Sequence, residues 1–255
     1  MNILNQLVSW FADPAHWSGS GGVPIRLLEH LYYSGLALLI GLVVALPIGL
    51  AVGHTGKGSF LIVGLANGLR ALPELGVLIL LVLFMGIGLI PVVIALSILA
   101  IPPLLAGAYA GIRNVEPAVV DAARGVGMRE QQVLFKVELP NALPLILGGL
   151  RSAALQVIAT AAVASFVSFG GFGRYIFDGL RIRDYPQMAA GALLVAALAL
   201  AVEGVLALVQ RWVVSPGLRA SGGARRSPTA DVAGTPEPAQ SDDPSPAPEL
   251  AGVKR

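Results

Sequence analysis

The chain is built from long apolar runs separated by short polar breaks, a pattern typical of membrane-spanning segments. Five runs have about the 20 residues that are needed to cross a hydrocarbon core of about 30 Å. The strict alternation of barrel strands is absent, and backbone groups in lipid must be paired within their own element, so each run predicts a helix. The predicted spans cover residues 27–53, 59–89, 90–112, 144–167 and 187–213.

The second span is the hardest to delimit. Arg70, Pro73 and Glu74 interrupt it, which allows residues 59–69 to form a packed or surface helix before a crossing that begins near residue 72. Splitting this region gives an alternative count of six spans. Because Arg70 and Glu74 are spaced i,i+4, they are predicted either to neutralise each other or to help form a gate.

Glycine and proline positions add detail to the bundle. Gly64-x-x-x-Gly68 and Gly107-x-x-x-Gly111 are signatures of close helix packing in membranes. Pro102-Pro103 predicts a break in the third span, because proline removes a donor from the helix ladder. The sequence therefore predicts helices that approach closely but are not all regular.

Two stretches lie outside the spans. Residues 1–26 place no Lys or Arg ahead of their apolar residues, unlike a signal peptide. A short interfacial helix and a loosely ordered lead-in are both compatible with this stretch. Pro, Ala, Ser and Gly dominate residues 214–255 without apolar periodicity, which predicts a disordered tail. The interfacial helix would present Ile3, Leu4, Leu7, Val8 and Phe11 on one face.

Composition supports an all-α integral membrane protein. Hydrophobic residues make up 55% of the chain and charged residues 13%, whereas soluble domains carry about 25% charged residues. The absence of cysteine excludes disulfides, thiolate metal sites and a cysteine nucleophile. No P-loop pattern is present, and the three histidines are scattered, so we expect no bound cofactor or metal. No basic, aromatic-interleaved patch suggests nucleic acid.

The distribution of Lys and Arg predicts the orientation. Five spans with an outside N-terminus place ten Lys and Arg residues on the inner side and four on the outer side, in agreement with the positive-inside rule. The C-terminus is then cytoplasmic. The inner residues are Lys57, Arg70, Arg113, Arg124, Arg129, Lys136, Arg211, Arg219, Arg225 and Arg226, and the outer residues are Arg26, Arg174, Arg181 and Arg183.

A polar segment between the third and fourth spans is thereby predicted to be cytoplasmic. Pro117 suits the first turn of a helix, and Gly125 and Gly127 suit a left-handed end to it. A second helix is predicted over residues 128–137, ended by Leu139-Pro140 before the fourth span. Two capped helices joined by a glycine turn make a compact knob, here residues 114–143, suited to docking onto a cytoplasmic protein. An ordinary connecting loop is the alternative.

The spacing within the knob resembles the EAA loop of binding-protein-dependent ABC transporter permeases. That pattern is Glu-Ala-Ala, three residues, Gly, nine residues, Ile, one residue, Leu-Pro. Every spacing is kept here, with Asp121 in place of Glu and Val137 in place of Ile. The resemblance implies that these positions contact a cytoplasmic ATPase: Asp121, Ala122, Ala123, Gly127, Val137, Leu139 and Pro140.

A wider resemblance concerns the osmoprotectant branch of that family. Residues 69–81, 101–128 and 143–176 are similar to permeases for glycine betaine, carnitine and choline, and the resemblance extends over residues 27–213. It implies a bacterial plasma-membrane subunit that works with an ATPase, a separate extracytoplasmic binding protein and a second permease, identical or different. An importer of methionine or a polar amino acid is the alternative. A membrane enzyme or a passive channel is disfavoured, because the spans offer no catalytic constellation and a channel needs no docking knob.

Several residues in or near the spans have two interpretations. Arg151 and Glu203 are predicted to form an ion pair between the last two spans rather than to contact the solute. Few aromatic residues lie in the middle of the spans, so an aromatic cage for a quaternary ammonium group is expected in the binding protein instead. A translocation pathway at the outer end of the fourth span is predicted to be lined by Ser165, Phe166, Ser168 and Phe169.

Overall fold

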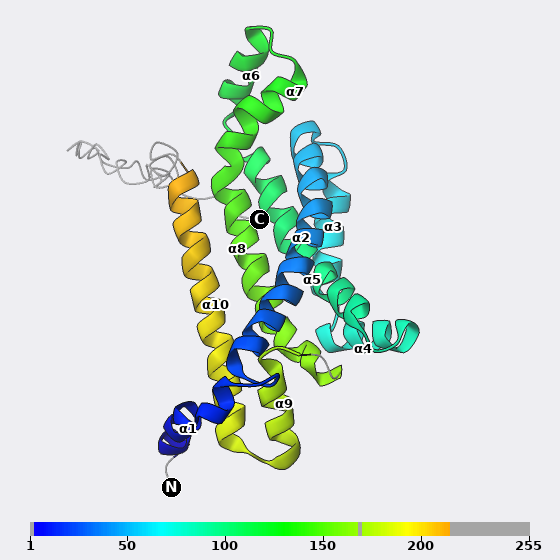
Figure 1. Ribbon diagram of the computed structural model, residues 1–255. Coiled ribbons are helices and arrows are strands. Elements are labelled where there is room, and N and C mark those ends of the chain that lie inside the picture. Colours follow the sequence, from blue (N-terminus) through cyan, green and yellow to red (C-terminus); the bar gives the residue numbers. More distant parts are fainter. Residues whose placement is uncertain (1–2, 168–169, 215–255) are drawn as a thin grey trace, which may run out of the picture.

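The computed structural model describes residues 3–167 and 170–214, and every regular element in this part of the chain is helical (Figure 1). The predicted tail lies almost wholly outside these residues. The elements are α1 (Ile3–Ala12), η1 (Pro14–Trp17), α2 (Val23–Thr55), α3 (Ser59–Arg70), α4 (Glu74–Met85), α5 (Leu89–Arg113), α6 (Pro117–Gly125), α7 (Glu130–Val133), η2 (Leu134–Glu138), α8 (Leu139–Ala164), η3 (Ser165–Val167), α9 (Gly173–Ile182) and α10 (Tyr185–Val213).

Four helical stretches are long and apolar enough to cross a membrane by themselves: α2, α5, the run of residues 130–167 and α10. Helices α3 and α4 meet this condition only as a pair, bent by 86°. Each has 12 residues and is about 18 Å long, which is too short for a core of about 30 Å. The described chain therefore supports four spans, or five with the bent pair, and does not support six.

The bend separates two charged residues that the sequence had placed on one helix. Pro73 disfavours helical geometry at Leu72, so α3 ends at Arg70 and α4 begins at Glu74. The prediction that Arg70 and Glu74 neutralise each other is wrong, because no ion pair joins them in the described structure. The Glu74 carboxylate instead accepts a hydrogen bond of 3.0 Å from the Thr160 hydroxyl of α8.

Helix α5 forms the centre of the bundle and packs between α2 and α8 (Figure 1). It stays helical through Pro102 and Pro103, so the predicted break is wrong. Both prolines are buried, and so are most of the other residues of α5 that face α2 and α8. Packing on two sides therefore holds α5 together where two ladder hydrogen bonds are lost.

Small residues allow these three helices to approach closely. A Cβ atom on Gly49 of α2 would lie 2.6 Å from the Ala108 Cβ of α5. One on Gly107 of α5 would lie 2.8 Å from the Cα of Gly149 in α8, and one on Gly111 would lie 2.9 Å from a backbone oxygen. Close packing at Gly107 and Gly111 is thus confirmed. Gly64 and Gly68 face open space within the described chain.

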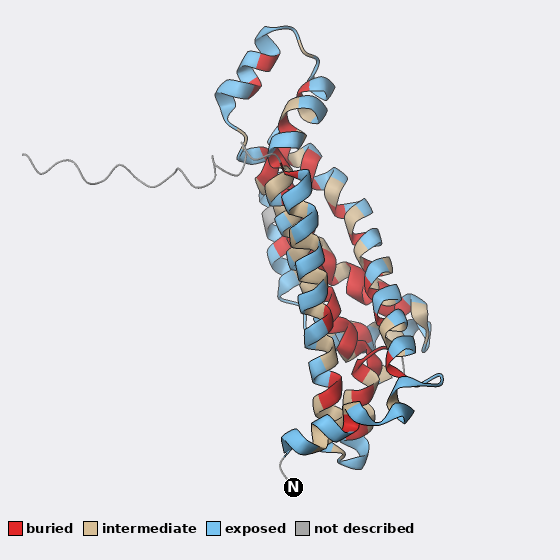
Figure 2. Cartoon of the chain, turned by 60° about the vertical axis from the view of Figure 1, so that its left-hand side comes forward, coloured by how far each residue is buried: buried red, intermediate tan, exposed pale blue. Residues whose placement is uncertain are grey.

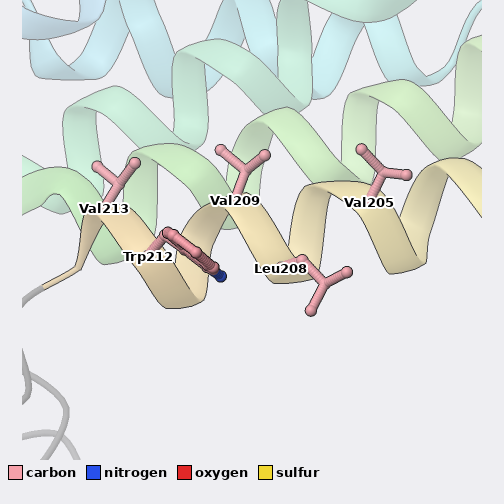
Figure 3. Close-up of a pocket in the computed structure, with 5 residues that line it drawn as sticks. All are labelled: Val205, Leu208, Val209, Trp212 and Val213. Atoms are coloured by element: carbon pink, nitrogen blue, oxygen red, sulfur yellow. The ribbon is translucent and has the colours of Figure 1, made fainter.

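Helix α10 lies at the edge of the bundle and is tied to α8 by polar contacts. Arg151 forms the predicted ion pair with Glu203, and its Nη1 donates to the Gln210 Oε1 at 2.8 Å. The Gln210 amide in turn donates to the Pro144 carbonyl at 3.2 Å. A shallow apolar groove on the open face of α10, where Trp212 is 87% exposed, fits contact with lipid (Figure 3). It is lined by Val205, Leu208, Val209, Trp212 and Val213.

The end of the bundle opposite the knob is closed by short helices. The first, α1, is helical as one of the two interpretations predicted, and it packs Leu7, Trp10 and Phe11 against the cluster that includes α10. Ile3, Leu4 and Val8 stay exposed. The second, α9, was not predicted. The N–H of Gly171, just before α9, donates to the Glu29 carboxylate of α2 at 2.8 Å.

Helix contact through glycine predicts a position-specific loss of stability. Gly107→Ala is expected to lower the free energy of unfolding by about 1–3 kcal/mol, because the added methyl group meets backbone atoms that cannot rotate away. The control is Gly148→Ala, at an exposed position in α8 with no heavy atom within 4 Å of the new Cβ. Thermal unfolding in detergent should separate the two variants. Equal midpoints would contradict the close-packing interpretation.

Candidate docking site

The knob projects beyond the ends of α2 and α5 as a helical hairpin (Figure 1). It contains α6, α7, η2 and the first residues of α8. Its surface is mostly exposed, in contrast to the inner faces of the bundle (Figure 2). The geometry is that of an ordered projection, as the sequence predicted.

The first helix of the knob ends in a Schellman motif. Pro117 occupies the first helical position, where its missing N–H costs no hydrogen bond. After Gly125, the last helical residue, Gly127 has a φ of 84°. The Gly127 N–H bonds to the Arg124 carbonyl at 2.9 Å, and the Met128 N–H bonds to the Ala123 carbonyl at 3.2 Å. The left-handed position is therefore Gly127 and not Gly125.

The second helix of the knob does not end before the span, contrary to the prediction. It begins at Glu130, passes through the π-turn η2 and continues as α8. Pro140 has no N–H for the Lys136 carbonyl, and the wider π-turn immediately before α8 shifts the hydrogen-bond pairing at that point. The Asn141 side chain supplies another donor, to the Val137 carbonyl at 2.7 Å. The knob is thus continuous with a membrane span.

A small apolar core holds the two helices of the knob together. Val120 and Ala123 of α6 are buried against Val133 of α7. Met128 and Val137 pack around them. This core makes the knob a folded unit rather than an open loop.

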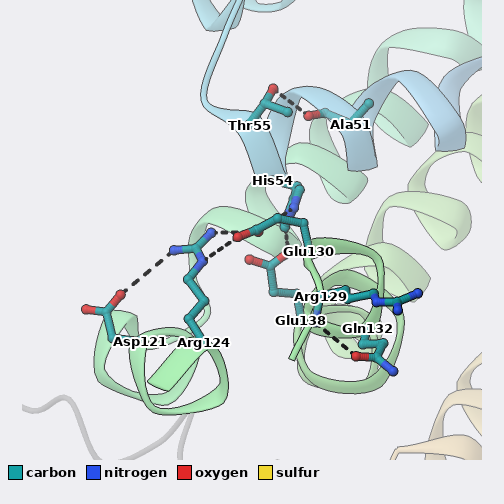
Figure 4. Close-up of polar contacts among 9 residues, drawn as sticks. All are labelled: Ala51, His54, Thr55, Asp121, Arg124, Arg129, Glu130, Gln132 and Glu138. Carbon is teal, nitrogen blue, oxygen red and sulfur yellow. Dashed lines mark hydrogen bonds and ion pairs between the residues drawn. The ribbon is translucent and has the colours of Figure 1, made fainter. Parts of the chain in front are cut away.

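A fork of hydrogen bonds closes the outside of the hairpin (Figure 4). The Arg124 guanidinium donates to both oxygens of the Glu130 carboxylate at 3.0 Å. Arg124 also lies 3.8 Å from Asp121, one turn before it on α6, so this second ion pair is present but weaker. The hydrogen bonds to Glu130 raise the pKa of Arg124, which keeps this guanidinium charged.

The seven residues of the EAA-like pattern divide between the surface and the interior. Asp121, with its side chain 75% exposed, lies on the surface with Ala122 and Pro140. Gly127 lies at the exposed turn. The other three pack inward: Ala123 and Val137 in the knob core, and Leu139 where the knob meets α2 and α5. The pattern therefore combines a presented surface with the residues that support it.

One histidine near the knob was missed by the sequence analysis. His54, in the last turn of α2, places its Nδ1 2.5 Å from the Glu138 carboxylate and its Nε2 3.1 Å from the Glu130 carboxylate (Figure 4). His54 is far from both residues in the sequence, and no spacing rule connects them. Only the folded bundle brings them together.

The residues predicted to line a pathway lie at the opposite end of α8. Ser165 is buried, and its hydroxyl donates to the Gly170 carbonyl at 2.8 Å. Phe166 is 49% exposed and stacks edge-on with Phe177, with ring centroids 5.5 Å apart. Ser168 and Phe169 lie outside the described residues. A role for these residues in translocation stays a prediction.

Comparison with known proteins agrees with this architecture. A family model described as "Binding-protein-dependent transport system inner membrane component" matches residues 37–215, and the chain belongs to this family. A solved structure of the MetNI methionine ABC transporter in an inward-facing conformation has a TM-score of 0.69 and 19% identity, and covers 80% of this chain and all of that one. At this identity the likeness concerns the fold alone.

Three curated relatives are transport permeases. The glycine betaine/carnitine/choline transport system permease protein OpuCB of Bacillus subtilis is 35% identical over 85% of this chain and 97% of its own length. The carnitine transport permease protein OpuCB of Listeria monocytogenes is 32% identical with the same coverage. The choline transport system permease protein OpuBB of Bacillus subtilis is 33% identical over 79% of this chain and 93% of its own.

Alanine substitution at the two glycines of the knob is expected to affect amide hydrogen exchange differently. Gly127→Ala forces a side chain into the left-handed region, at a cost of about 1–2 kcal/mol. Amide hydrogen exchange at position 127 and at Met128 is then expected to be about 5- to 30-fold faster than in the unsubstituted protein. Gly125→Ala, the control, adds a methyl group in open space at a helical residue and should leave exchange unchanged. Similar exchange in both variants would contradict the assigned turn.

Proposed function

We propose that the chain is the permease subunit of an ATP-driven importer for osmoprotectants of the glycine betaine, carnitine and choline type. The relatives described above are named for these solutes, and they match over most of their length at 32–35% identity. The sequence has no P-loop, so ATP hydrolysis is assigned to a partner subunit. The osmoprotectant assignment rests on the relatives, and the transmission of movement rests on the structure of the knob.

The observation that carries the coupling mechanism is the continuity of the knob with α8. The run from residue 130 to residue 167 is one helical stretch, so a force on the knob moves the span without an intervening hinge. Asp121, Ala122 and Gly127 would be presented to the ATPase, and Ala123 and Val137 would keep the two short helices in register. Movement of two docked knobs on ATP binding would then reorient the spans.

The proposed orientation places the knob in the cytoplasm and the N-terminus outside. The knob lies at the same end of the bundle as the C-terminal ends of α2, α5 and α10 (Figure 1). Positive residues at that end outnumber those at the other, in keeping with the positive-inside rule. The knob end carries Lys57, Arg113, Arg124, Arg129, Lys136 and Arg211, and the opposite end carries Arg26, Arg174, Arg181 and Arg183.

The remaining assignments follow from the same proposal. Residues 27–213 form the permease domain, after a lead-in of residues 1–26 and before a tail of residues 214–255. The complete transporter adds a cytoplasmic ATPase, an extracytoplasmic binding protein and a second permease, identical or different. The family description, which names dependence on a binding protein and an inner-membrane component, supports this division of roles. Solute recognition is assigned to the binding protein.

Reconstitution tests the solute. The complex with its ATPase and binding protein, reconstituted in proteoliposomes, is expected to transport labelled glycine betaine, carnitine or choline. Transport should occur only when ATP is present on the side of the membrane that carries the ATPase. An unlabelled excess of the same solute should compete, and methionine should not. If the complex instead takes up methionine or a polar amino acid with ATP, and none of the three osmoprotectants, the osmoprotectant assignment is wrong. The role of the chain as a permease would then still stand.

A substitution at the glycine turn tests docking. Gly127→Trp is expected to abolish co-purification of the ATPase while membrane insertion is unchanged, because the indole occupies the presented face of the knob. The matched control is Gly19→Trp, at a glycine with a φ of 76° and open space at the opposite end of the bundle. Both variants carry the same kind of backbone strain. Retention of the ATPase by the Gly127 variant would refute docking through the knob.

A further inference from the structure

A cluster of charged groups joins the first span to the knob. His54 is in the last turn of α2, and Glu130 and Glu138 lie two turns apart along the α7–η2 helix. The imidazole contacts both carboxylates, at 3.1 Å and 2.5 Å (Figure 4). The end of α2 is therefore fastened to the helix of the knob at two points.

The burial of Glu138 shows that the contact matters energetically. This residue is 4% exposed, and a buried carboxylate is costly unless it is paired. The described structure shows His54 as its one hydrogen-bond partner. His54 is in turn favourably placed when charged, because it lies at the C-terminal end of α2, where the helix dipole favours a cation.

The Nδ1–Glu138 hydrogen bond and the Nε2–Glu130 ion pair are both favourable only when the cluster holds a shared proton. A carboxylate is an acceptor, and a neutral imidazole has a single N–H, so two carboxylate partners require either imidazolium or a protonated glutamic acid. As the pH rises, loss of that proton replaces one of the two favourable contacts by a repulsion between lone pairs. The contact is then weakened although the side chains stay in place.

Water can exchange this proton through a polar pocket beside the cluster. The pocket has a volume of about 200 Å³, far more than the 10–15 Å³, roughly, that one water requires. Charged groups reach it from every element packed around His54. They are Glu138 from η2, Asp121 and Arg124 from α6 and Arg113 from α5, and Glu130 from α7 contacts the ring directly.

From this geometry we infer that His54 is a positioning residue that carries movement of the knob to α2, and that the link holds only in the protonated cluster. Helix α8 moves with the knob because the two are continuous, whereas α2 is joined to it by apolar contacts around Leu139 and by the contacts of His54 with Glu130 and Glu138. The inference rests on the proposed function for the source of the movement. The link itself is a property of this chain.

The link can be measured without transport. The chain has no cysteine, so spin labels at Lys57→Cys and Arg129→Cys, both at exposed positions, report only on the end of α2 and the knob. In the complex with the ATPase, the distance distribution is expected to be narrow near pH 6 and broad near pH 9, because the cluster loses its shared proton as the pH rises. His54→Phe should be broad at both values, and His54→Arg, which stays charged, narrow at both.

Two glutamate-to-glutamine variants of the knob, one outside the cluster and one inside it, supply the matched control. Glu116→Gln removes an exposed carboxylate from the same knob and should keep the pH-dependent distribution of the parent. Glu138→Gln is expected to abolish the pH dependence. A distribution in His54→Phe that is as narrow as that of the parent at both pH values would overturn the inference, and so would a parent distribution that does not change with pH.

The consequence for transport is tested in the same complexes. His54→Phe is expected to keep ATP hydrolysis while uptake per ATP falls by roughly fivefold or more, within the usual range of coupling between sites. Unchanged uptake per ATP would refute the role of His54 in coupling. Absence of uptake by the unmodified complex would contradict the proposed function, and the spin-label distances would still decide whether the link exists.

Discussion

One unbroken helical run, from Glu130 to Val167, connects the polar knob with the interior of the bundle. It survives Pro140 because the ladder changes to π-type pairing over Leu134–Glu138, just before the proline. The other parts of the knob attach to this helix. The Gly127 turn folds α6 back onto it, and the Arg124 fork holds α6 in place. The proposed docking surface and a membrane span are thus ends of the same element.

Packing in the bundle follows from the lack of a hydrophobic driving force between helices in lipid. Gly49, Gly107 and Gly149 remove side chains where α2, α5 and α8 cross, so backbone atoms meet directly. This close contact also explains why α5 stays helical through two prolines. Helix α10, by contrast, exposes most of its apolar surface and is anchored to α8 through Arg151, Glu203 and Gln210.

Charges are few, and in the described chain several of those near the knob join separate elements. Arg124 and Glu130 join the two helices of the knob, and His54 joins α2 to both carboxylates of the α7–η2 helix. Burial makes the His54–Glu138 contact more consequential than an exposed pair, since Glu138 has little access to water that would replace its partner. The position of α2 relative to the knob therefore depends in part on a contact between a histidine and a buried carboxylate.

Local patterns in the sequence determined the helical class, the approximate spans and the glycine turn of the knob, because each depends on residues within a few turns of one another. The Gly107 pair and the Arg151–Glu203 ion pair were also predictable, since small and charged residues within lipid have few stable environments. Only the tertiary structure decided that Pro102-Pro103 leaves α5 intact and that Glu74 turns to Thr160 instead of Arg70. Nor could the sequence place His54 against Glu130 and Glu138. Contacts between elements far apart in the chain depend on helix rotation and register, which are set by packing of the whole bundle and not by spacing along the chain.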